Sequence, residues 1–259
     1  MALTKTPQEI EKMRRGGALL SKALGAAVAL VKPGVSIKEL NDLAEKVIRE
    51  GGGEPSFLGY KGSPDDTPFP STVCISVNEE VVHGLGNRER KLKEGDIVGL
   101  DIGLWLEGLC TDMAVTVPVG NVSEEATKLM RVTREALMKG VEAAHVGGMI
   151  RDIAQATEEY VKPHGYGIVR ALVGHGVGHK VHEAPHVPNY VSEHYPAVQI
   201  QEGMCLALEP MLGLGGDYRV DTAQDGWSIV MRDGSLGAHF EVTIAVTKDG
   251  TEILTPLPV

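Results

Sequence analysis

Four acidic residues stand inside or at the ends of apolar, β-branched runs, where carboxylates are rare. They are Asp101, Asp112, Glu209 and Glu241. An ionised carboxylate in such surroundings needs a counter-charge, and a divalent metal ion supplies one. Four carboxylates and an imidazole are too many ligands for one tetrahedral zinc, but they suit two divalent ions that share bridging carboxylates. Such a pair of ions lowers the pKa of a bound water toward about 7, so this set predicts hydrolysis.

The imidazole is expected from residues 173–186, which have the sequence VGHGVGHKVHEAPH and include four of the nine histidines. The apolar run Ile168 to Val173 leads into them, so we expect a strand that ends in a Gly-rich loop, where a ligand can approach closely. A short histidine-rich run alone can be accidental, and the carboxylates elsewhere in the chain favour a functional site. No GxSxG motif, Walker loop or dinucleotide-binding GxGxxG is present.

A hairpin is predicted to bring two of the acids together. IVGLDIG and LCTDMAVTV, within 93–119, are apolar strands, and Glu107 with Gly108 offers a turn between them. We expect Asp101 and Asp112 to lie directly opposite each other on one face. Like charges opposed in this way are destabilising unless a cation lies between them.

Two helices are predicted at the start of each half of the chain. Thr6, Pro7 and Glu9 match a capping box that opens a helix running to about Lys32, and Ser36 with Glu39 opens a second helix that ends at 51–53. In the second half, a helix runs from Ser123 to about His145, and another opens near Asp152 and ends near His164. Residues 57–71 are loop-like, VCISV is a strand, and 78–86 is a loop that carries His83.

The two halves of the chain resemble each other weakly. EGDIVGLD, ending at Asp101, aligns with EGMCLALE, ending at Glu209, and DMAVTV from Asp112 aligns with EVTIAV from Glu241. VVH ending at His83 likewise matches KVH ending at His182. Because these coincidences fall on candidate site residues, we predict one domain over 1–259 with pseudo-repeats at about 6–119 and 123–250, and a site on their two-fold axis.

Composition bounds the remaining possibilities. The chain has 259 residues and a formal charge of -10, which argues against a nucleic-acid partner, because phosphate binding needs clustered Lys and Arg. No apolar run approaches the length of a membrane span, and the N-terminus has no signal-peptide core. The three widely spaced cysteines indicate reduced, buried thiols, so we expect a cytoplasmic protein.

Together, VCISVNEEVVHG, the DIG and TD aspartates, GHGVGHKVHEAP, LEPM and HFEVT resemble type I methionine aminopeptidases. The resemblance covers nearly the whole chain, in order and spacing. It implies the α+β pita-bread fold, in which a central curved antiparallel sheet is flanked by two pairs of helices with internal pseudo-two-fold symmetry. The segment from Glu209 to Glu241 is too short for the helical insertion of type II enzymes.

The resemblance also implies a role for each matched residue. Asp101 chelates one metal, Asp112 and Glu241 bridge both, and His175 with Glu209 completes the other. A metal-bridging hydroxide attacks the carbonyl of the N-terminal residue, and the free amine binds beside Asp101. The catalytic residues are then His83, His182 and Glu209. Glu209 relays the proton, His182 polarises the scissile amide, and His83 supports the leaving nitrogen.

The implied activity is removal of N-terminal methionine when the second residue is small. The apolar methionine pocket is expected from Phe57, Tyr60, Phe69, Cys74 and Trp227, although plain core packing is an equal alternative for each aromatic. The chain departs from the family pattern at the apparent insertion 63–68, at Gly86 in place of proline, at Val242 in place of histidine and at His239 in place of glutamine. These departures should leave the metal site intact and affect pocket shape and substrate range.

Two other functions remain open. A prolidase-like Xaa-Pro aminopeptidase shares the fold and ligands but usually carries an N-terminal domain, and a metal-free binding module would be expected to lack some of the ligands. The resemblance implies two divalent ions (Co, Mn, Fe, Ni or Zn). Its partners would be N-terminal segments of nascent proteins and, transiently, the ribosome, with no nucleic acid or membrane involved. We expect a monomer.

Overall fold

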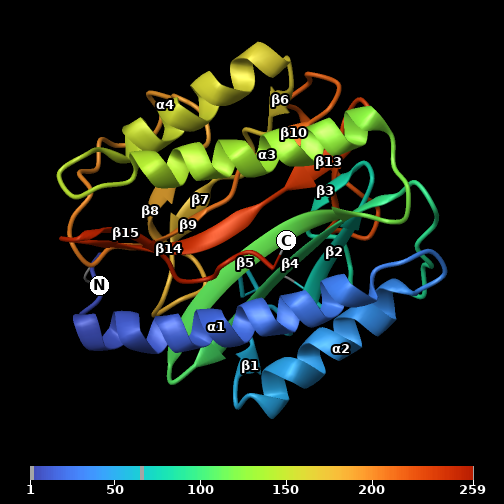
Figure 1. The fold of residues 1–259 in the computed structure, drawn as a ribbon, viewed down its shortest axis with the longest axis horizontal. Helices are drawn as coiled ribbons and strands as arrows, with labels where there is room; N and C mark the ends of the chain where they lie inside the picture. The colour runs from blue at the N-terminus through green and yellow to red at the C-terminus, as the bar shows by residue number, and fades with distance from the viewer. Residues whose placement is uncertain (1–2, 65–66, 259) are drawn as a thin grey trace.

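The computed structural model describes residues 3–64 and 67–258, so positions 65 and 66 of the expected insertion lie outside the described residues. Its described part has four α-helices: α1 (Pro7–Leu30), α2 (Ile37–Glu50), α3 (Glu124–Ala143) and α4 (Ile150–Val161). α1 packs on α2 and α3 on α4. Figure 1 shows the two pairs on opposite sides of the strands. The helix pairs are confirmed, whereas the duplication of 6–119 and 123–250 stays a prediction.

The helices begin where the capping residues predict. The Thr6 hydroxyl accepts the N–H of Glu9, whose carboxylate accepts the N–H of Thr6, and Ser36 with Glu39 repeats this reciprocal pair. Such boxes satisfy N–H groups that the first helical turn leaves without partners. α1 ends at Leu30, slightly before the predicted end. A short 3-10 helix, η1 (Lys162–His164), follows α4.

Nine strands of the described chain form the main sheet, and all their pairings are antiparallel. In sheet order they are β1 (Glu54–Pro55), β4 (Ile97–Leu106), β5 (Leu109–Pro118), β14 (Glu241–Thr247), β9 (Cys205–Leu208), β7 (Gly174–Gly176) and β8 (Glu183–Val187), with β2 (Val73–Val77) on β4 and β15 (Gly250–Ile253) on β14. Two small sheets adjoin it: β13 (Gly237–His239), β10 (Met211–Gly213) and β6 (Gly167–Ile168); and β11 (Val220–Thr222), β12 (Ile229–Met231) and β3 (Glu80–Val82).

One face of the main sheet packs against the helices and forms the principal core. Leu100, Ile102 and Leu104 of β4 are fully buried, in one cluster with Leu20 and Leu24 of α1. Because successive side chains of a strand point to opposite faces, Asp101 projects from the other face of β4. The same alternation therefore places the principal core on one face of the sheet and Asp101 on the other.

The β4–β5 hairpin has a different register from the one expected. Leu106 pairs with Leu109, so Asp101 lies opposite Ala114 and Asp112 opposite Gly103. Glu107 and Gly108 both have positive φ, as a two-residue type I′ turn requires, and this turn fixes the register. The direct pairing of the two aspartates was wrong. They are diagonal neighbours that still share a face.

Two further local expectations were wrong. The strand that carries His175 is Gly174–Gly176 itself, and the preceding apolar run contributes only its first residue to β6. A Cβ on Gly174 or Gly176 would lie within 2.4 Å of a carbonyl oxygen of a neighbouring strand, so glycine permits this close pairing. The predicted loop 78–86 contains β3, whose partner β12 is remote in sequence and invisible to local pattern.

Among the helices in 3–64 and 67–258, none combines the length and the apolar character that crossing a membrane requires.

Candidate metal centre

Five neighbouring strands each place one potential ligand in the same cavity. In sheet order these are Asp101 on β4, Asp112 on β5, Glu241 on β14, Glu209 directly after β9 and His175 on β7. Every second side chain of a strand lies on the same face of the sheet. The sheet therefore brings together side chains that are up to 140 positions apart in the sequence. A convergence of this kind cannot be produced by any one segment.

Several ligand atoms are close enough to share an ion. One atom each from Asp112, His175 and Glu241 lie within 4.8 Å of one another, and so does a second set from Glu209, His239 and Glu241. His175 Nε2 is 3.5 Å from Glu209 Oε1. Asp101 lies outside both sets but lines the same cavity.

Burial and mutual repulsion make these acids reluctant to ionise when no cation is present. Burial raises the pKa of Asp101 to about 7. Burial, reinforced by neighbouring carboxylates, raises the pKa of Asp112, Glu209 and Glu241 well above the ordinary range. Burial also lowers the pKa of His175 to about 3, which keeps its imidazole neutral as metal coordination requires.

The buried polar atoms fit a divalent cation. Asp101 Oδ1, Asp112 Oδ1 and Glu241 Oε1 are buried and have no hydrogen-bond partner within the described chain. Native proteins rarely leave such atoms without a partner, so each one needs an explanation. Carboxylate oxygens and a neutral imidazole are ligands of Mn, Fe, Co, Ni and Zn, so divalent ions bound among these side chains would give the buried oxygens partners.

The stability of the metal-free protein should fall as pH rises above neutrality. A carboxyl whose pKa is raised on folding keeps its proton only in the folded chain, so its stabilising effect is lost as pH rises through the folded pKa. The histidines with lowered pKa act in the opposite direction, but only below about pH 6.5. We expect the free energy of unfolding to drop between about pH 7 and 8 by about 1.4 kcal/mol for each carboxyl that stays protonated.

Thermal unfolding in chelator at a series of pH values measures this slope. Reloading with a divalent ion should remove it, because the cation replaces the protons. A flat profile for the metal-free protein would show that these carboxyls are already ionised.

The cavity has a volume of about 570 Å³ and an aromatic wall. Phe57, Tyr60, Phe69, Cys74 and Trp227, the residues predicted for the methionine pocket, all line it. Phe69 and Trp227 pack edge to face with ring centroids 5.2 Å apart. All five side chains predicted for the pocket therefore line one cavity. Their contact with substrate stays a prediction.

His182 is an exposed residue that lines the cavity beside the candidate ligand His175. Their ring centroids are 4.4 Å apart, and the Tyr60 hydroxyl is 2.7 Å from His182 Nδ1. The following residue, Glu183, forms a 2.6 Å ion pair with the buried Lys5 ammonium. The N-terminal segment therefore fixes the loop that carries His182.

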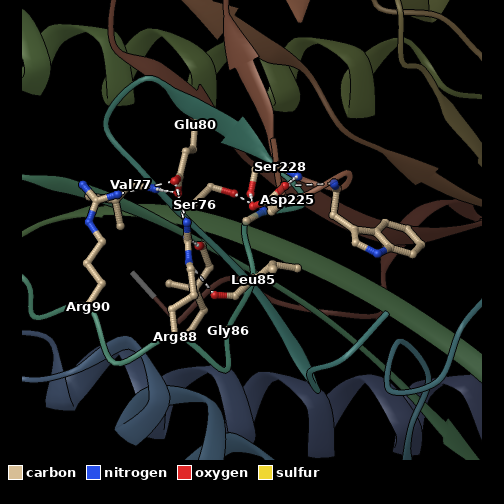
Figure 2. Close-up of polar contacts among 12 residues, drawn as sticks. Ser76, Val77, Glu80, Leu85, Gly86, Arg88, Arg90, Asp225 and Ser228 are labelled. Carbon is tan, nitrogen blue, oxygen red and sulfur yellow. Dashed lines mark hydrogen bonds and ion pairs between the residues drawn. The ribbon is translucent and has the colours of Figure 1, made fainter. Parts of the chain in front are cut away.

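His83 lies on a loop that a partly buried ion pair holds in place. Figure 2 shows the Arg88 guanidinium between Glu80 and the backbone of β2. It donates to Glu80 at 2.7 and 2.8 Å and to the carbonyls of Ile75 and Leu85, both at 2.9 Å. These contacts join both sides of the loop to β2. Burial lowers the pKa of His83 to about 4, so its imidazole is neutral near pH 7.

A second polar cluster in Figure 2 positions the aromatic wall. The Asp225 carboxylate accepts the N–H groups of Trp227 and Ser228, at 2.9 and 2.8 Å, and the Ser228 hydroxyl at 2.6 Å. The turn fixed by Asp225 leads into β12, which pairs with β3 directly before His83. Trp227 and His83 are therefore held by adjoining elements.

The sequence analysis missed some cavity residues and overestimated others. His186 and His239 line the cavity, and neither was assigned to the site. The HxE spacing of His239 and Glu241 was the available signal, because alternate strand residues share a face. Gly86 and Val242 were expected to affect the pocket, but neither is among the lining residues of the described chain. Val242 is fully buried in the core on the other face.

Comparisons with known proteins agree with this architecture. Residues 11–248 match the model of metallopeptidase family M24. Methionine aminopeptidase of Clostridium perfringens is 44% identical over 256 residues, which cover 98% of this chain and 99% of that protein. The crystal structure of methionine aminopeptidase from Thermotoga maritima has a TM-score of 0.91 at 42% identity and covers 97% of this chain and 98% of its own.

A prolidase from Pyrococcus furiosus is more distant. It is 23% identical with a TM-score of 0.77, and the match covers 98% of this chain but 65% of the prolidase. That similarity shows a shared fold alone. Together with the closer structure it confirms the expected pita-bread fold, a curled antiparallel sheet with four helices.

Proposed function

Since this chain belongs to metallopeptidase family M24 and its full-length relatives are methionine aminopeptidases, we propose that it is a metal-dependent aminopeptidase that releases N-terminal methionine. The observation that carries the proposal is the convergence of five potential metal ligands, four on neighbouring strands and Glu209 directly after β9, beside two histidines and an aromatic wall. Release of free methionine from Met-Ala-Ser by the metal-loaded protein tests it.

Asp101, Asp112, His175, Glu209 and Glu241 would together hold two divalent ions. When bound, two divalent ions polarise a carbonyl and bring the pKa of a water toward about 7. M24 membership implies divalent metals, and their number and identity are part of this proposal.

The surrounding residues would supply proton transfer and orientation. Glu209 is the ligand whose carboxyl we propose moves the proton from water to the leaving nitrogen, since it lies at the cavity wall between His175 and His239. His182, oriented by Tyr60, would donate a hydrogen bond to the carbonyl oxygen, and His83 would contact the leaving amide. A substrate side chain in the cavity of about 570 Å³ would leave the free amine of a chain end beside Asp101.

Replacing His83 or His182 by alanine should lower turnover by about 100-fold or more while leaving metal content unchanged. Neither imidazole belongs to the two sets of close ligand atoms, so removing either should not release an ion. Turnover on Met-Ala-Ser and metal per chain are the two measurements, with the exposed His194→Ala as a control. Loss of bound metal in either variant would reassign that histidine as a ligand.

The chain ends of newly made proteins are the substrates that we propose in the cell. Brief association with the ribosome, action as a monomer and the cytoplasmic location inferred from the cysteines all stay predictions.

A further inference from the structure

His239 lies where a pair of strands in the main sheet continues as a pair of strands in a small sheet. β9 continues through Glu209 and Pro210 into β10, while β13 continues through Phe240 into β14. Val242 pairs with Leu208 on one side of the bend and His239 with Met211 on the other, so the register is the same on both sides. Glu209 therefore faces Glu241 across the bend. His239, two residues before Glu241, lies on the same face.

The imidazole of His239 is buried and aimed at these carboxylates. The residue is 3% exposed, and its Nε2 has no hydrogen-bond partner in the described chain. Its backbone is locked, because its N–H donates to Thr116 Oγ1 and its carbonyl accepts the Thr116 hydroxyl, both at 2.9 Å. A buried ring nitrogen that is held in this position without a hydrogen-bond partner indicates that it binds some other group.

The distances fit a shared ion better than a hydrogen bond. His239 Nε2 is 3.6 Å from Glu209 Oε2 and 3.9 Å from Glu241 Oε2, both beyond hydrogen-bond range. Two donor atoms bound to one ion at about 2.1 Å and at a tetrahedral angle are about 3.4 Å apart. The proposed ligand pair His175 and Glu209 shows the same kind of separation, at 3.5 Å. Glu209 thus presents one oxygen to each imidazole.

We infer that His239 Nε2 is a further protein ligand, which binds an ion together with Glu209 and Glu241. This inference rests on the proposed metal centre, and it adds a second imidazole to a set that otherwise contains only His175. A second nitrogen donor favours cobalt, nickel and zinc over manganese, whose preferred ligands are oxygens. His239 would therefore change the metal preference of the centre.

The metal-free full-length protein, loaded with Co²⁺, tests the inference directly. An imidazole bound through Nε2 gives one strongly shifted, exchangeable Nδ1–H signal in the proton NMR spectrum of the Co²⁺ protein. We expect two such signals, of which His239→Gln removes one and His175→Gln the other. The exposed His194→Gln should remove neither. His239→Gln should also weaken Co²⁺ binding relative to Mn²⁺ by about tenfold or more in competition titrations.

A single shifted signal in the wild-type protein would overturn the inference, and this result needs no variant to fold. Weaker binding by His239→Gln with both signals retained would likewise contradict direct ligation. Absence of Co²⁺ binding to the wild-type chain would instead overturn the proposed metal centre itself. Methionine release by a protein with one imidazole signal would leave the proposed function standing and remove only His239 from the ligand set.

Discussion

Asp112→Asn and Glu241→Gln are each expected to lower both metal content and turnover, the latter by about 100-fold or more, while the protein remains folded. Asp112 and Glu241 are both 2% exposed. They lie on the adjacent strands β5 and β14, with β4 on one side and β9 and β7 on the other. An amide has nearly the shape of a carboxyl but carries no charge, so it cannot bridge two cations. Neither change opens a cavity, and in the metal-free protein each replaces an acid whose pKa is already raised.

Metal per chain, turnover on Met-Ala-Ser and thermal unfolding are measured for both variants. Asp249→Asn and Glu202→Gln, which make the same chemical changes at exposed positions, are the matched controls. Full hydrolysis by a metal-depleted Asp112→Asn protein would exclude a bridged two-metal centre.

The second large effect is expected in substrate choice. The cavity of about 570 Å³ has an aromatic wall suited to one long, unbranched side chain, for which the thioether of methionine is well adapted. The residue after it must pass between the loop of His83 and the turn that carries His182 and Glu183, both of which are held by ion pairs. Because these walls are fixed, a bulky second residue meets a steric clash.

We therefore expect methionine release from peptides that begin Met-Ala, Met-Gly or Met-Ser to exceed release from Met-Leu or Met-Lys by about 100-fold or more in kcat/KM. Ala-Pro peptides should release little of either residue. Preferential cleavage of Ala-Pro over Met-Ala-Ser would instead favour the prolidase-like activity. No cleavage of any peptide with any metal would favour a binding module.

The sequence predicted best what depends on local chemistry. The capping boxes of Thr6 and Ser36 located helix starts, because a cap is a contact within four residues. The Glu107–Gly108 turn was also found, but pairing Asp101 with Asp112 ignored the register that this turn imposes. The shared face survived the error, since a shift of two residues preserves the side of the strand.

Long-range pairing explains the remaining errors. β3 exists because it pairs with β12, which lies 150 positions later at the Glu80–Val230 pair, and β7 exists because its glycines let β8 and β9 approach. β9 and β12 are too far away in the sequence for a local pattern to indicate these pairings. The role proposed for His239 emerges only where β9 continues into β10, since that bend brings Glu209 opposite Glu241. Its HxE spacing indicated a shared face but not what lay across from it.

The central claim is that ions held by the carboxylates of the sheet perform the hydrolysis. It is tested most directly by titrating the metal-free protein with Co²⁺ while following free methionine released from Met-Ala-Ser. We predict no release in the presence of chelator and a rate that rises with added metal until no more than two ions per chain are bound. Full release by the metal-free protein, unchanged on adding metal, would contradict it.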